Sequence, residues 1–108
     1  MIKDFILKIG TTTYNKGRSL YINIIGNLIY ISWPTGRTYF KVDSPEYKKT
    51  IKNIRFYDEN KMSFVWDGEW SFSEFGGTGK TKHMVKQYVF TFNKPNDYKM
   101  MVKLMGVY

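Results

Sequence analysis

Residues 75–83 read FGGTGKTKH, a stretch that combines flexible glycines with basic side chains. Its Gly79-Lys80-Thr81 triplet matches the end of the phosphate-binding motif G-x-x-x-x-G-K-[ST], whose first glycine starts the wrap of backbone N–H groups around the phosphates. In this chain that first position is Glu74, whose carboxylate would repel a phosphate. The motif also needs a helix directly after it, yet the following residues alternate as in a strand. We therefore expect no nucleotide-hydrolysing site here.

Two other interpretations of this stretch remain open. The glycines can form a flexible connection between two strands, because they adopt positive φ angles easily and pack against nothing. In the second interpretation the basic side chains follow the phosphates of a nucleic acid, a role that suits lysine because it acts as a point charge. The side chains concerned are Lys80, Lys82, His83 and Lys86.

A second stretch has the same composition. Residues 10–19 read GTTTYNKGRS and carry Lys16 and Arg18. Both stretches lie in blocks without a carboxylate, residues 5–42 and 75–96, and the first block also contains Arg37 and Lys41. The formal net charge is +8, from 17 Lys and Arg against 9 Asp and Glu, which favours a polyanionic partner. Codon bias in an AT-rich genome is the competing explanation for the many lysines.

Aromatic residues make up 19% of the chain, enough to line a binding surface as well as a core. Bases stack on exposed rings while lysines hold the phosphates, so a basic protein with exposed tyrosines is typical of single-strand binding. The alternative is that the rings fill a β-rich core and form cross-strand pairs. The rings that we consider for stacking are Tyr14, Tyr21, Tyr30, Tyr39, Trp66 and Tyr88.

Catalytic and metal-binding chemistry has little support. The chain has no cysteine and a single histidine, His83, so thiolate catalysis and His or Cys metal clusters are not expected. Asp67 and Glu69 are two residues apart, but a hairpin tip, where we place them, holds two carboxyls poorly. We expect a non-enzymatic protein without metal or cofactor. Charged residues interrupt the apolar N-terminus, unlike a signal peptide, so we expect a cytoplasmic protein.

Two dipeptides predict hairpins. Gly26-Asn27 separates two β-branched runs and predicts a type II′ turn, with Ile25 opposite Leu28. The register places one apolar face toward the core: Leu20, Ile22, Ile24, Ile29, Ile31 and Trp33. Asp67-Gly68 predicts a second, type I′ hairpin between two aromatic-rich strands.

The remaining pattern predicts more strands and one helix. Residues 4–9, 37–42, 83–92 and 98–108 alternate as strands. Residues 43–54 have Asp43 or Ser44 as N-cap and Pro45 in the first turn, which predicts a helix near 44–53. The expected fold is a single mainly β domain, residues 1–108, an antiparallel sandwich or small barrel of about nine strands with one short helix.

The leading functional hypothesis is a small basic module that binds nucleic acid, single-stranded and with weak sequence preference. The other hypothesis is a protein-binding factor whose basic loops occupy an acidic groove, such as an inhibitor of a host protein encoded by a phage or mobile element, or a component of a larger assembly. We expect no contact with a membrane. The candidate contact residues are Lys16, Arg18, Tyr21, Tyr30, Arg37, Lys41, Lys80, Lys82, His83 and Lys86.

Overall fold

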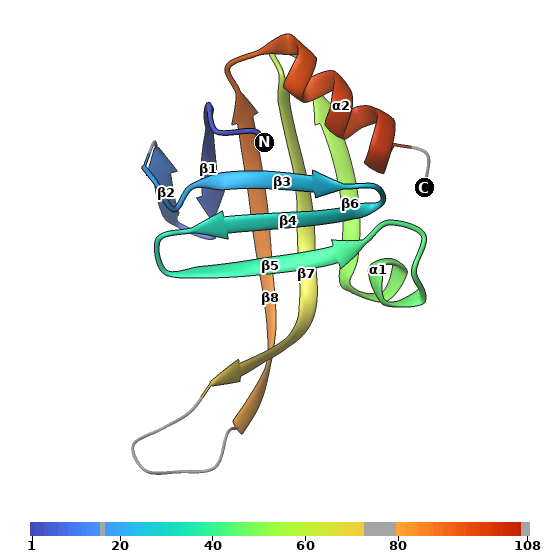
Figure 1. The fold of residues 1–108 in the computed structure, drawn as a ribbon. Coiled ribbons are helices and arrows are strands. Elements are labelled where there is room, and N and C mark those ends of the chain that lie inside the picture. Colours follow the sequence, from blue (N-terminus) through green and yellow to red (C-terminus); the bar gives the residue numbers. More distant parts are fainter. Residues whose placement is uncertain (16, 73–79, 107–108) are drawn as a thin grey trace.

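The structure is a computed structural model that describes residues 1–15, 17–72 and 80–106, with the backbone alone at 70–72 and 80. These residues form two antiparallel sheets, and the small one runs across the large one (Figure 1). The large sheet has the order β2 (Thr12–Asn15), β1 (Phe5–Ile9), β8 (Lys80–Phe92), β7 (Lys61–Phe72) and β6 (Ile51–Tyr57). The small sheet has the order β3 (Tyr21–Ile25), β4 (Leu28–Trp33) and β5 (Gly36–Lys41). The predicted mainly β, antiparallel fold class is confirmed.

The predicted hairpin at Gly26 is also confirmed. Ile25 lies opposite Leu28 and Ile22 opposite Ile31, and Gly26 has the positive φ of 59° that the turn requires. The predicted core face points inward: Ile24 is half-buried, whereas Leu20, Ile22, Ile29 and Ile31 have no exposed surface.

The predicted hairpin at Asp67-Gly68 is wrong. β7 runs without a turn from Lys61 to Phe72, and Gly68 lies opposite Met84 of β8 in a regular ladder. The glycine instead makes room for an indole, because a Cβ at Gly68 would stand 3.0 Å from Cζ2 of Trp66. Glycine in a strand interior often marks such a close approach. One long strand replaces two short ones, which leaves eight strands in the described residues instead of about nine.

Helix α1 (Pro45–Thr50) begins as predicted, with the Ser44 hydroxyl accepting a hydrogen bond from the Tyr47 amide at 3.1 Å. It is shorter than predicted because Ile51 is extended and begins β6. The predicted C-terminal strand is wrong, since residues 95–105 form helix α2 (Pro95–Met105). Apolar residues near the end of the chain alternate as in a strand. Met101 and Met105 are, however, also four residues apart, the spacing of one helical face, and both are buried against the core.

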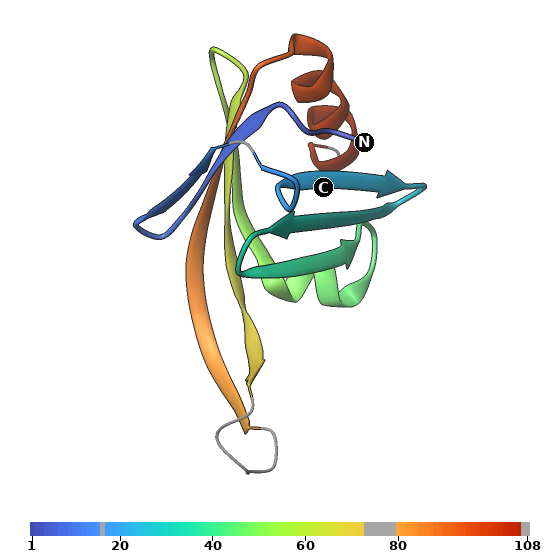
Figure 2. The same cartoon turned by 60° about the vertical axis from the view of Figure 1, so that its left-hand side comes forward.

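The inner faces of the two sheets and one side of α2 enclose the core, in which Phe64 and Phe90 are fully buried. A bridge between Ile2 and Ile22 joins the N-terminal segment to β3. Beyond Trp66 and Tyr88 the ribbon of β7 and β8 has no further strand beside it, because β6 pairs no farther than Trp66 and β1 no farther than Tyr88. Figures 1 and 2 show this ribbon, here called the arm (residues 67–72 and 80–87), extending away from the sheets. Within the described chain, neither α1 nor α2 is long and apolar enough to cross a bilayer.

Candidate nucleic-acid interface

The outer face of the small sheet gathers tyrosines and basic side chains. Alternation along β3, β4 and β5 places most apolar side chains inward, and the residues between them lie on the outer face, which near the Gly26 turn also carries Ile25 and Leu28. No Asp or Glu occurs anywhere in these three strands. We call this surface the tyrosine face, and its members are Tyr21, Asn23, Tyr30, Arg37, Tyr39 and Lys41.

The three rings of the tyrosine face are neighbours. Tyr21 and Tyr30 are stacked, with ring centroids 6.0 Å apart and planes inclined by 20°. Tyr30 lies directly opposite Tyr39 in the ladder, and Tyr39 is 67% exposed. Arg37 and Lys41 flank Tyr39 at a distance of two residues on either side along β5, and both are exposed. The face therefore offers an open ring with a cation on each side.

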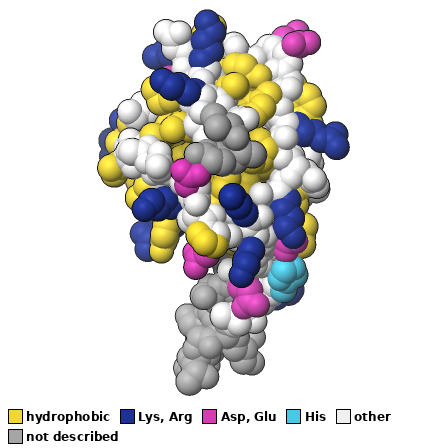
Figure 3. Space-filling model, turned by 90° about the vertical axis from the view of Figure 1, so that its right-hand side faces the viewer, with side chains coloured by type: hydrophobic (Ala, Val, Ile, Leu, Met, Phe, Trp, Pro, Cys, Tyr) yellow, Lys and Arg dark blue, Asp and Glu magenta, His cyan; other side chains and the backbone are white. Residues whose placement is uncertain are grey.

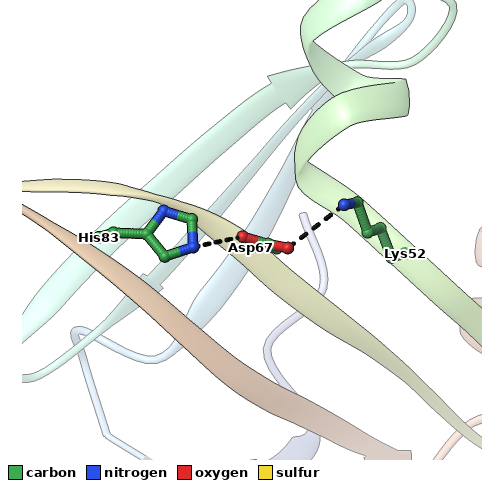
Figure 4. Close-up of polar contacts among 3 residues, drawn as sticks. All are labelled: Lys52, Asp67 and His83. Atoms are coloured by element: carbon green, nitrogen blue, oxygen red, sulfur yellow. Dashed lines mark hydrogen bonds and ion pairs between the residues drawn. The ribbon is translucent and has the colours of Figure 1, made fainter.

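Of the predicted basic residues of the second block, Lys86 lies on a strand as expected, and Lys82 and His83, which we assigned to the glycine-rich loop, belong to the same strand, β8. Lys82 and Lys86 are exposed on the side of β8 that also carries Met84 and Tyr88. His83 points to the other side, where its Nε2 lies 2.9 Å from Oδ1 of Asp67. Oδ2 of the same carboxylate accepts from Lys52 Nζ at 3.2 Å, so Asp67 ties β6 and β8 together at the base of the arm (Figure 4).

The remaining predicted residues fall near or beyond the limits of the description. Arg18 is exposed in the connection between β2 and β3. Lys16 lies outside the described residues, as does the side chain of Lys80. Residues 73–79, which include Gly76, Gly77 and Gly79, also lie outside them.

A cleft of about 170 Å³ opens between the two sheets at the base of the arm. Its floor consists of the buried residues Ile9, Trp33 and Tyr88, and its rim includes the exposed Thr35 and Lys86. The other lining residues are Thr12, Tyr14, Trp66 and Met84.

The walls of the cleft are held by contacts between distant segments. The hydroxyls of Tyr14 and Thr35 lie 3.0 Å apart and link β2 to the turn between β4 and β5. Trp33 and Tyr88 meet edge to face at 5.7 Å. Burial, and to a smaller extent the neighbouring Tyr14, raises the pKa of Tyr88 above its usual range.

The cleft is where the two carboxylate-free blocks of the sequence meet. Thr35 belongs to the first block and Lys86 to the second, and both line the same cavity. Sequence reasoning named Tyr14, Trp66 and Tyr88 as rings to consider, but it assigned Trp33 to the core and missed the cleft. Only the pairing of distant strands could have revealed it.

The outer face of the large sheet is also basic, but it differs in composition. We call it the large-sheet face, and register places on it Lys8, Lys52, Arg55, Tyr57, Lys61 and Val89. On the side of the molecule that carries β6 and α1, Lys and Arg are interspersed with Asp and Glu, including around the base of the arm (Figure 3).

No protein-family model, curated protein or solved structure matches this chain. Among the described residues, no three His, Asp or Glu side chains gather in a group that could hold a metal ion. The candidate interface therefore has to be judged from its own geometry and charge.

Proposed function

We propose that this protein is a small cytoplasmic, non-enzymatic module that binds single-stranded nucleic acid with weak sequence preference. The observation that carries the proposal is the tyrosine face, where Tyr39 lies open between Arg37 and Lys41 on strands free of carboxylates. Every base has a π-face, so rings on a sheet accept any sequence, and neighbouring cations neutralise the phosphates between the stacked bases.

Electrostatics favours the same surface. The three consecutive strands of the tyrosine face carry no acidic side chain, and the net charge of +8 attracts polyanions at long range. Arg37 suits this role in a second way, because a guanidinium can stack on a base as well as bind phosphate.

Binding of a fluorescently labelled homopolymeric DNA or RNA strand, measured by anisotropy over a salt series, tests the proposal. We expect the logarithm of the association constant to fall linearly with the logarithm of salt concentration, with a slope of about −0.7 for each phosphate contact. Strands of different base composition should bind with similar affinity. Absence of binding at low salt, or an affinity that does not respond to salt, would refute the proposal and leave the protein-binding hypothesis as the one to pursue.

A further inference from the structure

We infer that the cleft between the sheets takes up one nucleobase, with the attached phosphate held by Lys86, as a pocket for a single nucleotide of the bound strand. This inference rests on the proposed function and extends it from the tyrosine face to a second, enclosed contact.

The size of the cleft selects a single ring system. At about 170 Å³ it is smaller than the cavities of roughly 300–1,000 Å³ that enclose drug-sized ligands. It is close to a cavity of about 150 Å³ that takes up one benzene molecule. One flat heterocycle therefore fits, and a longer ligand has to continue along the protein surface.

The lining matches a nucleobase better than an aliphatic group. Tyr14 and Trp66, both partly exposed, supply aromatic walls, on which bases stack, above a floor that includes the buried rings of Trp33 and Tyr88. The hydroxyls of Thr12, Thr35 and Tyr14 supply hydrogen-bonding groups at the margins of the cleft.

The charge at the rim favours an anionic ligand. Lys86 is exposed, and no carboxylate is among the residues that line the cleft. Lys82 lies on the same side of β8, four residues from Lys86 and farther out along the arm. The basic side chains therefore continue outward from the cleft. A base in the cleft therefore has its phosphate beside Lys86.

The position of the cleft connects it to the tyrosine face. Thr35 lines the cleft, and Arg37 begins the tyrosine face only two residues later, a separation of roughly 7 Å along a strand. A strand that crosses the tyrosine face and passes Arg37 reaches the mouth of the cleft within about one nucleotide. The two surfaces can then hold successive parts of one ligand.

Two glycines keep the two tryptophan rings in place. A Cβ at Gly36 would stand 3.0 Å from Cζ2 of Trp33, and a Cβ at Gly68 would stand 3.0 Å from Cζ2 of Trp66. Each indole therefore packs directly against a glycine backbone, and a larger residue at either position would displace it.

Titration with adenosine monophosphate, followed by tryptophan fluorescence, tests the inference because Trp33 and Trp66 line the cleft. We expect a saturable change in emission, with adenosine binding more weakly and ribose 5-phosphate giving no change. Lys86→Ala should weaken adenosine monophosphate binding about two- to fivefold, the usual effect of one exposed charge pair, and leave adenosine unaffected. Lys8→Ala removes the same charge from an exposed strand position on the large-sheet face and is the matched control, expected to bind adenosine monophosphate like the wild type.

The outcomes separate this inference from the proposed function. If a labelled strand binds and loses affinity on Tyr39→Ala, but adenosine monophosphate leaves the emission unchanged, the nucleotide pocket is refuted and the proposed function stands. If adenosine monophosphate binds in the Lys86-dependent way but strands do not bind, the pocket stands and the proposed function falls. If N-acetyltyrosinamide binds as tightly as adenosine monophosphate, the cleft accepts any ring and the inference is refuted.

Discussion

The outer faces of the two sheets both carry tyrosine and basic residues, yet the tyrosine rings differ in exposure and in the side chains that contact them. On the small sheet, Tyr39 is 67% exposed and Tyr21 stacks on Tyr30. On the large sheet, Tyr57 is 40% exposed, and Lys61 Nζ lies 5.8 Å from its ring centroid. A cation of the protein itself thus lies over the ring on the large sheet, whereas no cation of the described residues lies over the ring of Tyr39.

The same contrast applies to hydrogen bonding and charge. The Tyr57 hydroxyl lies 3.3 Å from the Ser63 hydroxyl, and the Tyr57 carbonyl accepts from the Tyr98 hydroxyl at 2.9 Å. At the edge of the large-sheet face, Asp67 binds Lys52 and His83. The internal partners of the side chains therefore distinguish the two faces, in addition to their composition.

The largest expected effect is the difference in affinity between two variants, each of which lacks one tyrosine ring on one of the two faces. Tyr39→Ala should weaken binding of a labelled single strand about 5- to 150-fold, because stacking of one base contributes roughly 1–3 kcal/mol. Tyr57→Ala removes an equal ring from the large-sheet face and should leave the affinity unchanged. Anisotropy at fixed salt measures both, and thermal unfolding checks that the two exposed substitutions preserve the fold. Equal losses in the two variants would mean that the tyrosine face is not the binding surface.

A smaller effect is expected from the cations of the two faces. Arg37→Gln and Lys41→Gln should each make the salt dependence less steep by about 0.7, the contribution of one phosphate contact in a single strand. Lys61→Gln changes the net charge by the same amount on the large-sheet face and should leave the slope as it is. Parallel salt series for the three variants measure the difference. A slope that changes equally in all three would indicate attraction by net charge without a defined contact surface.

Local signals in the sequence predicted the small sheet well. The Gly26 turn fixes the register of β3 and β4, and strict alternation then puts Tyr21 and Tyr30 on the outer face. The start of α1 at Ser44 was equally predictable, because the side chain of an N-cap residue accepts a hydrogen bond from an amide three residues later. Each of these features depends on residues that are close together in the chain.

Features that depend on distant partners could not be predicted. Asp67-Gly68 has the composition of a turn, but both residues pair with β8, opposite Val85 and Met84, and the Trp66 indole covers the glycine. The cleft likewise combines Tyr14 of β2 with Lys86 of β8, whose proximity follows from the sheet order and the packing of one sheet on the other. Alternation in the sequence predicts on which side of a strand a side chain lies, but not which residues of other strands it contacts.

The smallest expected effect concerns ionisation of the ring on the large-sheet face. The hydrogen bond from Ser63, helped by the charges of Arg55 and Lys61, lowers the pKa of Tyr57. The difference between the absorbance titrations of the wild type and Tyr57→Phe should therefore show a midpoint below the usual phenol value of about 10. Ser63→Ala should move this midpoint upward, because it removes the largest cause.

The sign of the linked stability effect follows from the same pKa. A phenol whose pKa is lower in the folded state contributes stability above its unfolded pKa of about 10, and this contribution is lost as the pH falls through the folded value. Denaturant unfolding should thus show the wild type gaining stability relative to Tyr57→Phe as the pH rises through the lowered folded pKa toward about 10, with a constant difference above it. A constant difference between the two proteins across that range would mean that Tyr57 is not engaged by its neighbours, and the contrast between the two faces would lose its basis.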